Sequence, residues 1–144
     1  MRLLIMSCCA SLVAGGAAAS SYTVTCPAKF PNEHIRFAGA PAGWAPYAPS
    51  PLEATTADVM YGPPESYTYA VPDTYKEAER RITATWKLAP GAEHQKWLQC
   101  GYGRAAELTL SQPLRAATSE CTVTRTIDAN SNVTKVAAVC KLAP

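Results

Sequence analysis

The stretch Trp97-Leu98-Gln99-Cys100-Gly101-Tyr102 decides how the rest of this 144-residue chain is interpreted. Side chains alternate between the two faces of an extended strand, so three large residues share one face: Leu98, Cys100 and Tyr102. The Trp97 side chain stands on the opposite face. Bulky side chains on both faces indicate a strand that is covered on both sides, so we expect this stretch to be the central strand of the domain.

Seven further stretches carry strand patterns: Ser21–Cys26, Lys29–Phe37, Leu52–Tyr61, Arg81–Leu88, Ala106–Leu110, Cys121–Ile127 and Asn132–Cys140. Arg81–Leu88 alternates most cleanly, whereas Pro31 interrupts Lys29–Phe37. We expect the central strand to lie between Arg81–Leu88 and Ala106–Leu110, with Leu108 and Leu110 facing the core.

Helix signals are sparse. Thr74-x-x-Glu77 fits a capping box, so Tyr75–Arg81 is expected to form one or two helical turns. Many short strands separated by turn signals predict an all-β fold, namely a small antiparallel β-sandwich or barrel-like domain. Long proline-rich loops, at most one short helix and two disulfides complete this expectation.

Residues 1–19 are typical of a signal peptide. The basic start Met1-Arg2 precedes an uncharged apolar run that ends in Ala17-Ala18-Ala19, the small-residue pattern read by signal peptidase. Cys8 or Cys9 would suit a lipoprotein, but few apolar residues precede them. We predict a single domain over residues 20–144, periplasmic or secreted, with no membrane span after cleavage.

Cleavage would leave four cysteines, and an even number in an exported chain indicates disulfides. Four cysteines allow three pairings. The turn composition of Asp128–Asn132 predicts a hairpin that places Cys121 opposite Cys140, which leaves Cys26 with Cys100. No C-x-x-C pair occurs among the four, so a zinc site is not expected.

The charge balance gives little sign of an anionic partner. The chain carries 13 basic and 11 acidic side chains, and losing Arg2 with the leader lowers the formal net charge from +2 to +1. The basic residues are scattered along the sequence. Nucleic acids and anionic membranes require a concentrated basic surface, so neither is expected as a partner.

Aromatic residues gather in the proline-rich segment between residues 44 and 75. Rigid aromatic side chains on loops provide contact area at low entropic cost, which suits a protein-binding face. The alternative is that they cover the core as a lid. The candidate binding residues are Trp44, Tyr47, Tyr61, Pro63, Pro64, Glu65, Tyr67 and Tyr69, with the Gly62–Glu65 turn as the rigid part.

Catalytic motifs are missing from the sequence. No G-x-S-x-G and no phosphate-binding glycine loop occur, and the four cysteines are expected to be bonded. Glu33-His34 and Glu93-His94 could hold a metal only if they converged across space, because adjacent residues of a strand point to opposite faces. We therefore expect no catalytic residue, no cofactor and no metal.

Short motifs in a fixed order resemble those of a family of small exported bacterial proteins that has no established activity. The pieces are Thr25-Cys26-Pro27, Gly43-Trp44, Tyr61-Gly62-Pro63-Pro64-Glu65, Val71-Pro72-Asp73, Thr85-Trp86-Lys87-Leu88, the central strand, Leu108-Thr109-Leu110 with Pro113-Leu114, and Cys121-Thr122-Val123. The resemblance implies an exported β-rich domain.

The function expected from the sequence is non-catalytic binding, by a monomer, of a protein or another envelope component. One alternative is an inhibitor of an extracellular hydrolase such as a lysozyme or a protease, by analogy with other small disulfide-linked β proteins. A second alternative is a small hydrolase, which would need His34 or His94 beside a carboxylate in a pocket.

Overall fold

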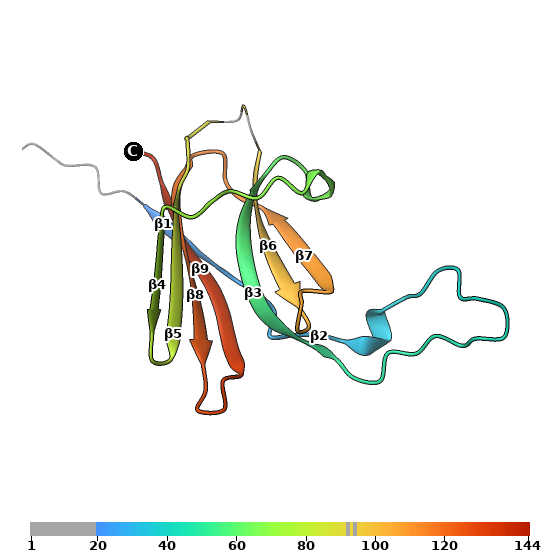
Figure 1. The fold of residues 1–144 in the computed structure, drawn as a ribbon. Helices are drawn as coiled ribbons and strands as arrows, with labels where there is room; N and C mark the ends of the chain where they lie inside the picture. Colours follow the sequence, from blue (N-terminus) through green and yellow to red (C-terminus); the bar gives the residue numbers. More distant parts are fainter. Residues whose placement is uncertain (1–19, 92, 94) are drawn as a thin grey trace, which may run out of the picture.

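The computed structural model describes residues 20–91, 93 and 95–144, and within them the chain forms two packed antiparallel sheets (Figure 1). The predicted signal peptide and His94 lie outside the described residues. In this part of the chain the helical elements are two 3₁₀ turns, η1 at Asn32–His34 and η2 at Pro64–Ser66. The predicted all-β class is confirmed.

The larger sheet has the strand order β1-β9-β8-β5-β4. Its strands are β1 (Ser21–Thr25), β9 (Val133–Leu142), β8 (Thr118–Ile127), β5 (Arg81–Lys87) and β4 (Thr74–Ala78). The smaller sheet has the order β2-β3-β6-β7. Its strands are β2 (Lys29–Phe30), β3 (Leu52–Tyr61), β6 (Lys96–Tyr102) and β7 (Leu108–Pro113).

The stretch that opened the sequence analysis forms β6, which pairs with β3 on one side and β7 on the other. The expected neighbour β7 is therefore correct, but the expected neighbour β5 is wrong. Strand β5 lies in the other sheet, where β4 and β8 occupy both of its edges. The chain crosses from one sheet to the other between β5 and β6.

The core lies between the sheets, where β3 packs against β8 and β9. It holds Val59, Leu98 and Tyr102 from the smaller sheet and Trp86 and Ala138 from the larger, all buried. The Trp86 indole N–H donates a 2.8 Å hydrogen bond to the Ala70 carbonyl oxygen, which fixes the segment after η2 against β5.

Both predicted disulfides are present. Cys26–Cys100 joins the end of β1 to β6 and so connects the two sheets. Cys121–Cys140 joins β8 to β9 at directly opposed positions, as the hairpin argument predicted. The Asp128 carboxylate closes that hairpin by accepting 2.8 Å hydrogen bonds from the backbone N–H groups of Asn130 and Asn132.

Three local expectations are wrong. The strand expected over Lys29–Phe37 shrinks to two residues, because Pro31 ends it and η1 follows. The helix expected over Tyr75–Arg81 is strand β4 and its turn, since pairing with β5 satisfies a backbone that would form only a marginal short helix. Leu110 is half-exposed, because β7 is an edge strand.

Candidate functional site

Most of the aromatic side chains between residues 37 and 75 face solvent, in three separate places. Trp44, Tyr47 and Tyr67 are 76%, 78% and 74% exposed. Tyr61 differs, since it is partly buried and packs against the core. The lid interpretation therefore does not describe Trp44 or Tyr47, whereas Tyr61 contacts the core.

The first place is the projecting loop, residues 35–51, which extends away from both sheets (Figure 1). Phe37, Trp44 and Tyr47 lie on it, and Phe37 and Trp44 line a shared open hollow with Pro41 and Pro46. The prolines restrict the backbone. The sequence reasoning missed Phe37. The signal that would have found it is charge, since residues 37–52 contain no charged side chain.

Polar contacts hold the base and the bend of this loop. The Asn32 side-chain amide donates a 3.1 Å hydrogen bond to the Ala48 carbonyl oxygen, which joins η1 to the returning arm. The Trp44 backbone N–H donates a hydrogen bond to the Pro41 carbonyl oxygen at 3.0 Å, so a tight turn presents the exposed indole. Gly43 within this turn has a φ of 83°, a conformation that favours glycine.

The second place is the segment after β3. The Gly62–Glu65 turn is compact, because the Gly62 N–H donates to the Gln95 carbonyl oxygen at 2.8 Å and Ser66 Oγ donates to the Tyr61 carbonyl oxygen at 3.2 Å. This turn stays near the smaller sheet, in contrast to the projecting loop (Figure 1).

Part of this second segment forms a shallow surface on the smaller sheet. Pro64, Glu65 and Tyr67 border a hollow whose other wall is β6 and β7. The Tyr69 hydroxyl donates a 2.6 Å hydrogen bond to Gln99 Oε1 of β6. Pro63 is exposed beside them. The structure therefore brings Pro64, Glu65, Tyr67 and Tyr69 together but leaves Trp44 and Tyr47 on a different element.

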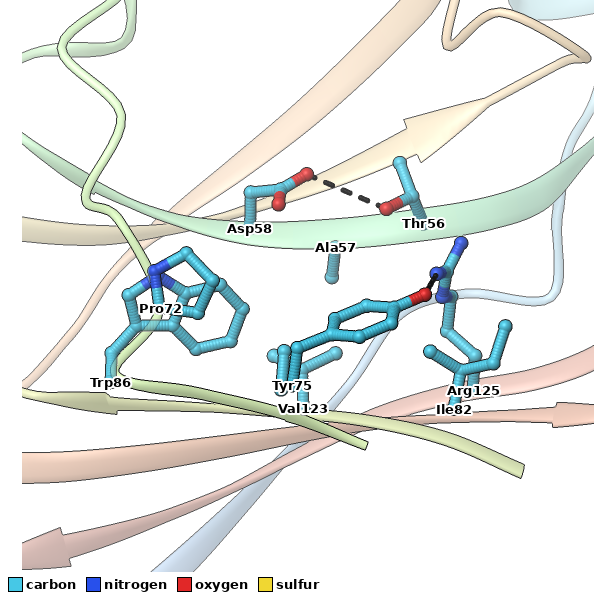
Figure 2. A pocket seen from close by; sticks show the side chains of 10 residues that line it. Thr56, Ala57, Asp58, Pro72, Tyr75, Ile82, Trp86, Val123 and Arg125 are labelled. Carbon is cyan, nitrogen blue, oxygen red and sulfur yellow. Dashed lines mark hydrogen bonds between the residues drawn. The ribbon is translucent and has the colours of Figure 1, made fainter. Parts of the chain in front are cut away.

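The third place is a cleft of about 120 Å³ between β3 and the inner face of β4, β5 and β8 (Figure 2). Its walls are largely apolar, with Ala57 pointing toward Tyr75 and Val123. At one end the Arg125 guanidinium donates a 3.5 Å hydrogen bond to the Tyr75 hydroxyl. Arg125 thus lies on the inner face of β8.

The residues that line the cleft include one acidic residue, Asp58 of β3. Asp58 and Thr56 point to the other side of β3 from Ala57, and Thr56 Oγ1 donates a 3.4 Å hydrogen bond to Asp58 Oδ2 (Figure 2). Burial raises the pKa of the Asp58 carboxyl above its ordinary value, against smaller opposing effects of Thr56 and the Arg125 charge. The residues lining the cleft include no histidine or cysteine.

The remaining chemistry is not gathered into a site within the described residues. His34 is exposed on η1 and packs edge-on against Phe30. No group of three His, Cys, Asp or Glu side chains in that part of the chain could hold a metal ion. Lys96 is buried, and its ammonium donates to the carbonyl oxygens of Gly91 and Ala116 at 3.2 and 3.0 Å, a structural arrangement.

Comparison with known protein families assigns this β domain to a family. Residues 47–141 match the model of the type VI secretion system Tli immunity protein family. The chain belongs to the Tli immunity protein family. No curated protein and no solved structure matches the chain.

Membership in the Tli immunity family makes this a bacterial protein and points to a non-enzymatic role, since an immunity protein binds and inhibits a toxin effector. This agrees with the expected binding role and makes the partner a protein. The matched region begins inside the projecting loop at Tyr47 and contains Cys121 and Cys140, but it leaves out Cys26. No helix of the described residues is long and apolar enough to cross a membrane.

Proposed function

We propose that this Tli family member is a periplasmic immunity protein that binds a type VI toxin effector, with the projecting loop as its main contact. Two observations together support the loop as the contact surface: its amino-acid composition and its position. It extends from the body, carries no charge beyond Arg36, and exposes Phe37, Trp44 and Tyr47. Exposed apolar patches of this kind mark interaction sites.

The physical expectation is that the two largest side chains of the loop anchor the complex. An aromatic side chain buries roughly 150–250 Å² when it enters a pocket. Such anchors typically cost about 2 kcal/mol or more when truncated to alanine, a loss of about thirty-fold in affinity. Proline and the Asn32–Ala48 hydrogen bond restrict the loop before binding, which lowers the entropy lost on association.

Export is part of the proposal. Two disulfides are characteristic of chains that fold outside the cytoplasm, and residues 1–19 carry the pattern of a signal peptide. We expect the mature chain to begin at Ser20 and to fractionate with the periplasm. N-terminal sequencing of the protein released by osmotic shock tests both points, and a chain that retains residue 1 in the cytoplasmic fraction would refute them.

The function is tested by protection. Each type VI effector of the source bacterium is expressed in the periplasm of a sensitive host, alone and with this chain. The proposal expects one effector to lose its toxicity when the wild-type chain is present and to form a stable complex with it. Failure to suppress any effector would rule the function out.

The loop is tested on that same effector. Trp44→Ala/Tyr47→Ala should weaken binding by two to three orders of magnitude, following the alanine costs above. Tyr67→Ala, which removes an equally exposed aromatic side chain at the end of η2, is the control. Strong loss in the control alone would move the contact to the surface formed by Pro64, Glu65, Tyr67 and Tyr69.

The hydrolase-inhibitor alternative and the immunity function are the same activity if the suppressed effector is itself a hydrolase. Inhibition assays with a lysozyme and with a protease give the direct comparison. Tight inhibition of either, without protection against any type VI effector, would replace the immunity function.

A further inference from the structure

The cations that look scattered along the sequence gather on one face of the larger sheet. Strand alternation turns Trp86, Val123 and Ala138 toward the core, so their chain neighbours point the other way. We call this second surface the outer face; it looks away from the smaller sheet (Figure 1).

Strand pairing arranges the outer face into rows that cross all five strands. One middle row contains Thr74, Thr85, Thr122, Val139 and Thr23. The next contains Lys76, Thr83, Thr124, Ala137 and Thr25. Almost all of these side chains are short, so the middle of the outer face is a flat field of methyl and hydroxyl groups.

Cations border this field. The row at one end pairs Lys87 with Glu120 and Glu120 with Lys141, and the row at the other end pairs Arg81 with Thr126 and Thr126 with Lys135. The Asp73 carboxylate lies beside this face, where it accepts a 2.6 Å hydrogen bond from the Lys87 backbone N–H. With Lys76 in the field, the paired rows themselves present five exposed cations and a single carboxylate, that of Glu120.

That carboxylate is already neutralised, since Glu120 Oε1 lies 2.7 Å from Lys141 Nζ. Within the described residues, the four other cations of the outer face form no ion pair. The chain without its leader carries a net charge of only +1, so the positive charge of this face is balanced by acidic groups elsewhere on the molecule.

We propose that the outer face is a second docking surface, which binds an acidic, flat protein surface on a part of the effector other than the part that the projecting loop contacts, because the loop leaves the molecule on the side of the smaller sheet (Figure 1). This inference rests on the proposed immunity function, and it adds the charge of the partner. A protein suits this face better than a lipid surface, because Val139 is its largest apolar side chain and no aromatic side chain is available to enter a bilayer. Nor is an aromatic side chain present to stack on nucleic-acid bases.

The charge acts before contact as well as in the complex. At an ionic strength of 0.15 M the Debye length is about 8 Å, so only cations close to the partner act strongly. Complementary charge of this kind typically raises association rates by ten-fold to a thousand-fold. The association rate with the effector is therefore the sensitive measurement, more than the dissociation rate, which the uncharged projecting loop governs.

The experiment measures association of the effector that the wild-type chain suppresses, at 0.15 M and 0.5 M salt. Lys76→Glu/Lys135→Glu reverses two cations of the outer face. Lys29→Glu/Arg104→Glu reverses two exposed cations that lie on other elements, with the same change in net charge. Thermal unfolding confirms that both variants fold.

The proposal expects the outer-face variant to associate at least ten-fold more slowly at 0.15 M, the control to change less than two-fold, and the difference to shrink at 0.5 M. Equal rates in the two variants, with normal wild-type binding, would overturn this inference and leave the immunity function standing. Absence of wild-type binding to every effector would overturn both.

Lipid is the remaining occupant to test. Wild-type chain is mixed with vesicles of phosphatidylcholine and phosphatidylglycerol at three to one. Co-sedimentation that the outer-face variant loses, together with unchanged effector binding, would assign the face to anionic lipid and overturn the proposal. Absence of co-sedimentation, with slowed effector association, supports it.

Discussion

Gly101 occupies a position of β6 where a side chain has no room. A Cβ built on it would lie 2.7 Å from the Ala106 Cβ and 2.7 Å from Thr56 Cγ2. Gly101→Ala therefore forces packed neighbours apart, which we expect to lower the free energy of unfolding by about 1–3 kcal/mol. Urea unfolding of the wild type and the variant measures the difference.

Ala106 provides a compensating change. Its φ is 54°, in the left-handed region that disfavours a residue with a Cβ. Ala106→Gly removes this strain and one of the two close contacts, so it should recover part of the loss caused by Gly101→Ala. Equal stability of the single and double variants would contradict the packing argument.

Asp58 gives the stability an unusual dependence on pH. Burial raises the pKa of its carboxyl in the folded state, so the folded protein binds this proton more tightly than the unfolded chain does. The contribution of Asp58 to stability therefore falls as the pH rises from the ordinary value of 3.8 through the raised pKa. Asp58→Asn should be more stable than the wild type at pH 7, and this advantage should vanish below that ordinary value.

The contribution of Asp128 to stability changes with pH in the opposite direction. Hydrogen bonds from Asn132 lower the pKa of its carboxyl, so its contribution is present above the ordinary value and is lost as the pH falls through the lowered pKa. Chemical unfolding between pH 2.5 and 7 follows both residues. An Asp58→Asn variant that is less stable than the wild type at pH 7 would show that burial is not the dominant cause.

Single residues were predicted well where one face of a strand decides their position. Leu98, Cys100 and Tyr102 share one face of β6 and are buried, as alternation predicted. Asp58 and Phe37 were missed, because a buried carboxyl and an exposed aromatic ring depend on neighbours from other elements that no local pattern contains.

Among the elements, long alternating strands were predictable and short ones were not. Leu52–Tyr61 forms β3 with the expected bounds. The helix prediction for Tyr75–Arg81 was wrong because pairing with β5 outweighs a local capping pattern. The partner strand β5 becomes available only when the hairpin forms. The projecting loop was recognised as loop from its prolines, but its extension from the body could not be predicted from them.

One side chain, that of Asn32, ties the base of the projecting loop to η1. Asn32→Ala removes the hydrogen bond to the Ala48 carbonyl oxygen. We expect faster proteolysis within residues 37–50 and a several-fold weaker affinity for the effector, because the loop must then be ordered on binding. The melting temperature should hardly change, since residues 37–47 are exposed.

Asn130→Ala at the exposed tip of the β8–β9 hairpin is the matched control for Asn32→Ala. It removes the same side chain from a loop without the aromatic residues. If Asn32→Ala and Asn130→Ala behaved alike in both proteolysis and binding, the hydrogen bond to Ala48 would have no role in ordering the loop.

At the scale of the whole molecule, the assignment of strands to two sheets was the part beyond sequence reasoning. Strands β5 and β6 are consecutive and both strongly patterned, yet they lie in different sheets. Alternation determines which residues face the core but does not name the partner strand. The same limit concealed the outer face, whose cations come from β4, β5 and β9.

The two disulfides act at different scales, and their removal should separate these roles. Cys121–Cys140 spans 19 residues within one sheet, whereas Cys26–Cys100 spans 74 and links the sheets. Loop entropy in the unfolded chain predicts losses of about 3 and about 4 kcal/mol for the paired alanine variants, measured by urea unfolding. In hydrogen exchange, Cys26→Ala/Cys100→Ala should let β3, β6 and β7 open while the larger sheet stays protected. Cys121→Ala/Cys140→Ala should affect β8 and β9 first. Uniform loss of protection in both variants would show that the sheets unfold as one unit, so that the bridge between them adds stability without coupling two separable layers.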